Sequence, residues 1–303
     1  MARRRTAAKT VCRASGSLAH AKKAIVPDLV DLDRDHPGFR DPAYRARRNR
    51  IAGLALSFVP GGKLPDVPYE PQEVAVWGTA LSHLAPLHSL RACPEYIAGY
   101  PKLGFREGHI PSFAEMNALL GPLTGFRLEP VAGLVTPRQF MERLADRVFL
   151  ATQYMRHHSA PLYTPEPDVI HELVGHGPLL ADPVFAELNR LFGEATRAAD
   201  DTQIDSLIRL YWYVLEFGVY QADGGLRVVG AGLLSSFGEL GRFEEKADLR
   251  PFDIARIAAT PFDPTDYQGV LFVSPSKEKL VDDLGAYLRA ACSRNAPQHA
   301  VAV

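Results

Sequence analysis

The pattern of apolar and polar positions after residue 35 is divided mainly by helix start and stop signals. Four segments open with a capping residue followed by Pro, or by Glu or Gln three residues later, and these starts are Ser112, Thr136, Asp182 and Ser274. The first of these helices is predicted to end at Gly121, because glycine commonly closes a helix. A long apolar segment, residues 202–221, runs to the Gly224-Gly225 turn. The pattern predicts a mainly helical protein.

Strand signals are fewer and shorter. Three short apolar runs predict strands, at 126–131, 226–230 and 269–273. No internal repeat, low-complexity linker or change of composition marks a domain boundary after residue 35. We therefore predict a mainly α fold with a few short β-strands, in a single catalytic domain. Its expected limits are residues 35–292, between a basic tail at 1–34 and a short C-terminal tail at 293–303.

Composition agrees with a globular protein that has a substantial core. The 303 residues are 47% hydrophobic and 23% charged, and the formal net charge of −1 gives no general reason to expect nucleic acid or an acidic membrane as partner. Three widely spaced cysteines favour a reducing compartment, and no apolar run approaches the roughly 20 residues of a membrane span. We expect a cytoplasmic protein. Residues 1–27 carry seven Lys or Arg and no acid, which predicts a solvated tail, with a transit peptide or a nucleic-acid arm as alternatives.

The stretch TPEPDVIHELVGHGPLL contains two histidines, His171 and His176, with one residue more between them than in the zinc-peptidase signature H-E-x-x-H. Residues five apart on a regular helix point roughly 140° away from each other. Gly175 and the Gly-Pro that follows His176 predict that the helix distorts or ends there, so that both imidazoles can converge on one metal ion. The extra residue also removes Glu172 from the position of a peptidase base.

A third candidate ligand is Glu216, the only acid in the apolar run LIRLYWYVLEFGVY. A buried acid needs a partner, and two partners are open: an ion pair, for instance with Arg156, or a metal ion. Two histidines and one carboxylate are typical of non-haem Fe(II) centres, and the same ligands also suit catalytic zinc. Aromatic residues crowd the region, although taken one at a time each is more often part of a core.

Longer motifs resemble the pterin-dependent aromatic amino acid hydroxylases. They are DHPGFRDPAYRARR, GFRLEPVAGL, RVFLATQYMRHHSAPLYTPEPDVIHELVGHGPLLADPVFAEL, LYWYVLEFGVY and GAGLLSSFGELGRFEEK, which stand in the family's order between about residues 35 and 290. The resemblance implies that the metal ligands are His171, His176 and Glu216. It implies a pterin site that includes Gly133, Leu134, Phe140, Glu172 and Tyr211. It implies a substrate site formed by Arg156, Thr164, Pro167, Asp168, Trp212 and Ser235, with Arg156 binding the substrate carboxylate and Asp168 supporting it.

The resemblance also implies an activity: hydroxylation of an aromatic amino acid ring with Fe(II), tetrahydrobiopterin or a related reduced pterin, and O2. The tryptophan at position 212 resembles the residue that the phenylalanine and tyrosine enzymes carry there. We therefore expect L-phenylalanine to be converted to L-tyrosine. The alternatives are tyrosine or tryptophan hydroxylation and 3-hydroxylation of phenylalanine. A zinc hydrolase with the same ligands and a non-catalytic binding protein are alternatives from other classes.

Several positions depart from the family pattern. Leu150 stands where the animal enzymes commonly carry histidine, and Pro264 lies in a loop that affects substrate preference. Animal members have a regulatory domain before the D-H-P-G-F motif and a tetramerising helix at the end. Only 34 residues precede that motif here. We therefore expect neither feature and predict a monomer or weak dimer, with a pterin-recycling enzyme as a possible pathway partner.

Overall fold

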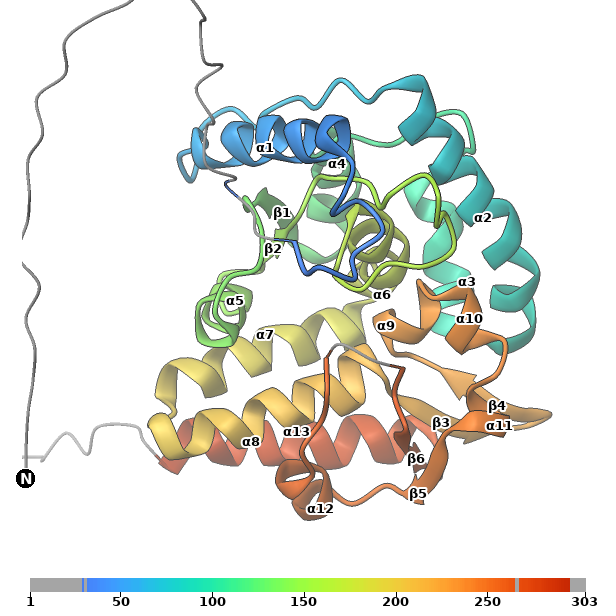
Figure 1. Ribbon diagram of the computed structural model, residues 1–303. Helices are drawn as coiled ribbons and strands as arrows, with labels where there is room; N and C mark the ends of the chain where they lie inside the picture. Colours follow the sequence, from blue (N-terminus) through green and yellow to red (C-terminus); the bar gives the residue numbers. More distant parts are fainter. Residues whose placement is uncertain (1–28, 30–31, 265–266, 295–303) are drawn as a thin grey trace, which may run out of the picture.

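The computed structural model describes residues 29, 32–264 and 267–294, and these form a mainly helical fold with two small sheets (Figure 1). The predicted fold class is confirmed. The basic segment at 1–27 lies outside the described residues, as do most positions of the predicted C-terminal tail. Helix α13 (Lys277–Arg294) overlaps the first two residues of that tail. No helix among the described residues has both the length and the apolar character needed to cross a membrane.

The first helices cover one side of the molecule. They are α1 (Pro42–Leu56), α2 (Pro71–Arg91), α3 (Pro94–Gly99), the 3₁₀ turn η1 (Tyr100–Leu103) and α4 (Phe113–Thr124). In α1, the side chain of Asp41 accepts hydrogen bonds from the backbone N–H groups of Ala43 and Tyr44. This Asp-Pro start is the same signal that marks residue 182, although it was not used to predict α1.

The predicted capping boxes at Ser112 and Thr136 are present, and they open α4 and α5 (Pro137–Leu144). The predicted end of α4 at Gly121 is wrong, because the helix continues through Gly121 to Thr124. Gly125 closes it instead, with a φ of 78° that favours glycine. The Asp182 cap opens α7 (Pro183–Ala198), whereas Ser274 belongs to a strand and α13 begins three residues later.

The long apolar segment is divided into three parts. Helix α8 (Asp201–Tyr211) passes into a wider π-helical turn, η3 (Trp212–Glu216), and the chain then enters strand β3 (Val219–Ala222). Helices α7, α8 and α13 lie side by side beneath the first helices (Figure 1). Glu216 is therefore held at the end of a helix that the core fixes, rather than inside a longer regular one.

Two small sheets complete the fold. Strands β1 (Arg127–Pro130) and β2 (Val148–Ala151) pair in parallel. A four-stranded sheet has the order β4-β3-β6-β5, with β4 at Gly225–Val228, β5 at Asp248–Pro251 and β6 at Val270–Ser274. The three predicted strands correspond to β1, β4 and β6, whereas β2, β3 and β5 were not predicted.

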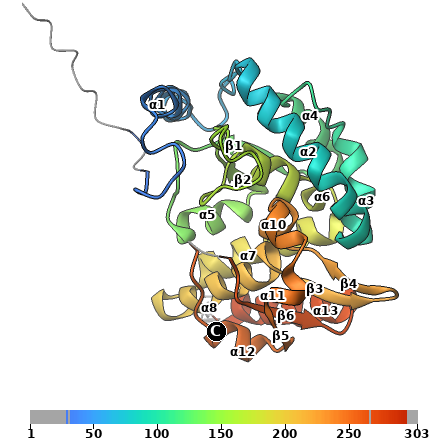
Figure 2. The same ribbon diagram turned by 45° about the vertical axis from the view of Figure 1, so that its right-hand side comes forward.

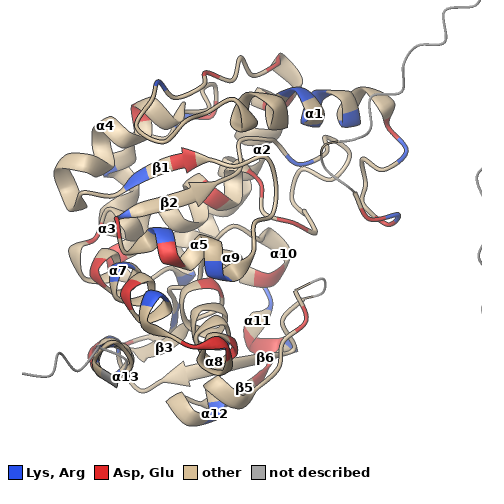
Figure 3. Ribbon diagram, turned by 90° about the vertical axis from the view of Figure 1, so that its left-hand side faces the viewer, with Lys and Arg blue, Asp and Glu red and all other residues tan. Residues whose placement is uncertain are grey.

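Short helices connect the layers. They are α6 (Gly177–Leu180), α9 (Ala231–Leu234), α10 (Phe237–Leu240), α11 (Phe243–Lys246) and α12 (Ile254–Ala259). Helix α10 packs against α9 and against α2, and α10 and α2 are labelled in Figure 2. Charged residues of both signs are spread over the surface, with arginines prominent on α1 (Figure 3). One large cluster of buried apolar side chains extends from α2 to α13 and surrounds the segments that carry the candidate site.

Candidate metal centre and adjoining cavities

The two histidines lie on a second π-helical turn, η2 (His171–His176), which explains their spacing. A π-helix bonds residues five apart, so it places such residues on nearly one face. The predicted distortion of the helix is present as this π-helical turn, whereas the alternative that the helix ends at His176 is wrong, because α6 continues directly from it. Gly175 has a packing role: a Cβ atom there would lie 2.8 Å from the carbonyl oxygen of Ala231, so glycine lets α9 approach η2 closely.

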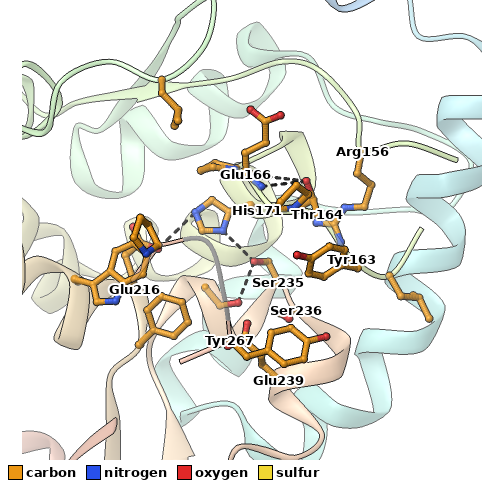
Figure 4. Close-up of a pocket in the computed structure, with 18 residues that line it drawn as sticks. Arg156, Tyr163, Thr164, Glu166, His171, Glu216, Ser235, Ser236, Glu239 and Tyr267 are labelled. Atoms are coloured by element: carbon orange, nitrogen blue, oxygen red, sulfur yellow. Dashed lines mark hydrogen bonds and ion pairs between the residues drawn. The ribbon is translucent and has the colours of Figure 1, made fainter. Parts of the chain in front are cut away.

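Three side chains converge from η2 and η3, and Figure 4 draws two of them, His171 and Glu216. The Nε2 atoms of His171 and His176 are 3.1 Å apart. One carboxylate oxygen of Glu216 lies 3.2 Å from His176 Nε2, and the other lies 3.5 Å from His171 Nε2. Ligand atoms on one first-row metal ion, each bound at about 2.1 Å, are about 3.0–3.4 Å apart. The arrangement fits a single ion held by two imidazoles and one carboxylate.

Burial and the short distances between the three groups shift their pKa values. Burial lowers the pKa of His171 to about 4, with Glu216 opposing the shift. Burial also disfavours the charged form of His176, but the carboxylate of Glu216 outweighs it and raises the pKa of His176. The same ion pair holds the pKa of Glu216 below its ordinary value despite burial. Glu216 is therefore an anion that faces imidazole nitrogen atoms, which is the charge state a metal ligand requires.

Glu172 is the other carboxylate near the two imidazoles. Its Oε1 accepts hydrogen bonds from the backbone N–H of Thr152, at 2.9 Å, and from the Thr152 hydroxyl, at 3.0 Å. Burial raises the pKa of Glu172 to about 7. Because Thr152 already holds this carboxylate and Glu216 faces both Nε2 atoms, Glu216 is the better third ligand.

Ser235 fixes the ring of His171. Its hydroxyl donates to the carbonyl of Ala231 at 2.8 Å, so the oxygen can accept from Nδ1 of His171, 3.0 Å away (Figure 4). With the proton on Nδ1, the Nε2 lone pair of His171 points to the proposed metal position. This contact adds an orienting function to a residue expected only in the substrate wall.

A cavity of about 310 Å³ lies on one side of the three ligands. It is lined by most of the expected substrate residues, namely Arg156, Thr164, Pro167, Trp212 and Ser235. Asp168 lies behind this wall, where its carboxylate accepts from Nε and Nη2 of Arg156 at 2.9 and 2.8 Å. Burial raises the pKa of Asp168, but Arg156 outweighs this and keeps the pKa below its ordinary value. The alternative of a Glu216–Arg156 ion pair is not what the structure contains.

A larger cavity of about 470 Å³ lies on the other side. All five residues expected to bind pterin line it: Gly133, Leu134, Phe140, Glu172 and Tyr211. Phe140 makes edge contacts with Phe149 and Tyr211, with ring centroids 5.2 and 5.4 Å away. Leu150 lines this cavity, whereas Pro264 lines both. The two cavities meet at His171 and Glu216, so groups placed in each would lie beside one metal ion.

Sequence reasoning missed Gln268. Its side-chain oxygen accepts from the indole N–H of Trp212 at 2.9 Å, and its amide group donates to the carbonyl of Asp263 at 2.9 Å. The backbone N–H of Gln268 donates to Glu239, also at 2.9 Å. A buried glutamine in a loop carries no sequence signal of its own, because its partner is 56 residues away.

Comparisons with known proteins agree with this geometry. A family model described as "Biopterin-dependent aromatic amino acid hydroxylase" matches residues 13–295. Human tyrosine 3-monooxygenase is 43% identical over 262 residues, covering 85% of this chain and 50% of the relative. Bovine phenylalanine-4-hydroxylase is also 43% identical, over 260 residues, covering 83% of this chain and 58% of the relative. The chain thus spans between half and three-fifths of the length of these two relatives.

Solved structures are similar over most of the chain. A phenylalanine hydroxylase from Chromobacterium violaceum with bound Fe(III) has a TM-score of 0.69 and 32% identity, covering 76% of this chain and 85% of that chain. A structure of the same enzyme with iron(III) and 7,8-dihydrobiopterin has a TM-score of 0.68 and 33% identity, with the same coverage. Phenylalanine hydroxylase from Legionella pneumophila has a TM-score of 0.69 and 31% identity, covering 76% and 92%.

Proposed function

Because the chain belongs to the biopterin-dependent aromatic amino acid hydroxylase family, we propose that it hydroxylates the ring of an aromatic amino acid with iron, a reduced pterin and O2. The observation that carries the proposal is the meeting of two cavities at His171 and Glu216, which converge with His176 on one position. The donor set fits Fe(II), which such ligands hold with positions left open for other molecules. When bound, the iron and the pterin together supply the activation of O2.

The smaller cavity is suited to the amino acid. Nε and Nη2 of Arg156 are held by Asp168, which leaves the Nη1 end of this rigid guanidinium for a substrate carboxylate. The indole of Trp212 stacks on Phe262, with ring centroids 4.3 Å apart, and Gln268 holds its N–H. A fixed aromatic wall of this kind positions an aromatic ring and excludes water from it.

The larger cavity is suited to the pterin. Its lining is mostly apolar, and Phe140 offers a ring for stacking. Gly133 and Leu134 offer backbone groups at its mouth, where Leu134 is exposed. Glu172 lies on this side of the centre and can accept a hydrogen bond from a bound heterocycle through the oxygen that Thr152 leaves available.

The preferred substrate is L-phenylalanine, with L-tyrosine as product. Support comes from the similarity to bacterial phenylalanine hydroxylase structures. Tyrosine 3-hydroxylation is a second candidate, because human tyrosine 3-monooxygenase and bovine phenylalanine-4-hydroxylase are equally identical to the chain, at 43%. The catalytic unit comprises residues 35–292 in this proposal, and it acts as a monomer or weak dimer.

The test is an assay of the purified, iron-loaded chain with tetrahydrobiopterin, O2 and each aromatic amino acid in turn. Mass spectrometry and chromatography identify the product and the position of its new oxygen. We expect tyrosine from phenylalanine, and no product when either iron or pterin is left out. The matched control is Glu216→Gln, which keeps the size of the side chain and removes its charge. It should lose iron and at least 1,000-fold in activity, roughly the effect of losing an essential group in a site.

Two outcomes contradict the proposal. Hydroxylation at the wild-type rate by the Glu216→Gln variant would remove Glu216 from the centre. A chain that holds zinc, ignores pterin and O2, and hydrolyses a substrate would instead support the zinc hydrolase reading.

A further inference from the structure

A second cluster of metal-binding side chains lies outside both cavities. Asp41, His157 and His158 each offer a ligand atom, and these atoms all lie within 4.8 Å of one another. Asp41 precedes α1, whereas the two histidines follow Arg156 directly in the loop after β2. The fold joins positions 116 residues apart, so nothing in the local sequence indicates the cluster.

The carboxylate of Asp41 is held in place with one oxygen available. Its Oδ1 accepts the N–H groups of Ala43 and Tyr44 at 2.8 and 3.1 Å, which caps α1. Its Oδ2 points to Nε2 of His157, at 3.2 Å. About a third of the Asp41 side chain is exposed, so an ion can reach this oxygen from solvent.

The ring of His157 is oriented by its neighbours. Tyr44 packs edge-on against it, with centroids 4.9 Å apart, and the Ser159 hydroxyl lies 2.7 Å from Nδ1. The backbone N–H of Ser159 also donates to Nδ1, at 3.3 Å, so Nε2–H donates to Asp41 when no metal ion is bound. A metal ion that displaces this proton would find Nε2 and the carboxylate already facing each other, with Ser159 fixing the ring from the other side. The 3.2 Å between Nε2 and Oδ2 falls within the about 3.0–3.4 Å expected for two ligands of one ion.

His158 supplies the third ligand from the solvent side. Its ring centroid lies 4.2 Å from that of His157, and its side chain is exposed, so a change of rotamer can bring its nitrogen closer. A cavity of about 200 Å³ adjoins Asp41 and His158 and leaves room for water ligands. Three arginines also line it, and each is paired with a carboxylate: Arg47 with Glu73, at 2.8 Å, Arg50 with Glu70, at 3.3 Å, and Arg156 with Asp168, at 2.8 Å.

We propose that Asp41, His157 and His158 bind a divalent transition-metal ion of the Zn²⁺ class, at a site separate from the centre formed by His171, His176 and Glu216. Two imidazoles and a carboxylate are ligands that such ions prefer, with water completing the coordination. A metal ion at this position ties the start of α1 to the loop that carries Arg156. The site does not depend on the hydroxylase activity, because none of its ligands lies in the two cavities beside His171 and Glu216.

The test is Zn²⁺ binding by the full-length chain after removal of all metal, measured by equilibrium dialysis at neutral pH with elemental analysis. We expect two equivalents for the wild type and one for Glu216→Gln, which keeps the second site. Asp41→Asn retains the helix cap and removes the anionic ligand, since asparagine also caps helices well. His158→Ala removes an exposed ligand and should leave the melting temperature of the metal-free chain unchanged.

Asp41→Asn and His158→Ala should each bind the second equivalent at least tenfold more weakly, while keeping the first equivalent and hydroxylase activity. The matched control, His109→Ala, removes a partly exposed histidine elsewhere and should retain both equivalents. A wild type that binds one equivalent overturns the proposal. So does a second equivalent that persists at unchanged affinity in both variants, because Asp41 and His157 then form only a helix cap and a hydrogen bond. Neither result bears on the hydroxylation assay.

Discussion

The two cavities beside the proposed metal centre share six lining residues, among them His171, Trp212 and Glu216, but the rest of each wall is built differently. The smaller has its polar groups fixed by buried partners: Arg156 by Asp168, and Trp212 by Gln268. The larger is mostly apolar and depends on aromatic packing around Phe140. The difference indicates that one proposed centre has two neighbouring sites, one suited to a polar ligand through fixed hydrogen-bonding groups and one suited to an apolar ring through packing. Substitutions on one side should therefore change one Michaelis constant and leave the other nearly unchanged.

The largest effect expected on folding stability concerns a buried histidine behind the smaller cavity. His88 lies under α9, where its Nε2 donates to the carbonyl of Leu234 at 2.7 Å. Burial lowers the pKa of His88 from 6.5 to about 4. The unfolded chain therefore takes up this proton first as the pH falls. The stability that neutral His88 contributes is complete above pH 6.5 and is lost between pH 6.5 and about 4, amounting to about 3 kcal/mol.

Chemical denaturation at a series of pH values checks this. His88→Gln should have a shallower loss of unfolding free energy over that range than the wild type. His83→Gln, at an exposed histidine, should keep the wild-type slope. Equal slopes for wild type and His88→Gln would show that this imidazole does not couple folding to protonation.

Arg156→Lys tests the polar side of the comparison. Lysine keeps the charge that Asp168 needs but cannot bond it through two nitrogens and still face the substrate. We expect kcat/KM for the amino acid to fall about 100-fold, with KM for the pterin within about twofold of wild type. Steady-state kinetics with each substrate varied in turn measures both. An equal rise in the two KM values would mean that Arg156 supports the whole centre rather than one cavity.

Phe140→Leu tests the apolar side. Loss of the ring should raise KM for the pterin about fivefold to tenfold, which is the usual contribution of an aromatic stacking contact, and leave KM for the amino acid nearly unchanged. The same kinetic measurements apply. Arg156→Lys is the matched control, since it should affect the other cavity. If Phe140→Leu raised only KM for the amino acid, the larger cavity would be the amino acid site rather than the pterin site.

Gln268→Leu should have the smallest effect. The indole N–H of Trp212 loses its acceptor, at a cost of about 1 kcal/mol, so KM for the amino acid should rise about fivefold. Gln221→Leu, at an exposed position, is the control. An unchanged KM in both variants would show that the stack on Phe262 alone holds the indole.

Much of the fold followed from local signals. The caps at Ser112, Thr136 and Asp182 start helices where expected, because capping depends on residues within one turn. The end of α4 was misplaced because glycine is tolerated inside a helix, and only the φ of 78° identifies Gly125 as the cap. Strands β2, β3 and β5 were missed because four-residue strands carry little pattern and depend on their neighbours.

The candidate site, like the fold, was predicted in part from the sequence and decided in part by the tertiary structure. The sequence by itself determined the mainly helical class, the family and the residue types at the centre, because motifs record which chemical groups are present and in what order. Only the tertiary structure decided that η2 and η3 are π-helical, that Trp212 bonds to Gln268, and that Asp41 meets His157 across 116 positions. Such contacts join segments brought together by the packing of the whole core. Their distances and partners are therefore not contained in any short stretch of the chain.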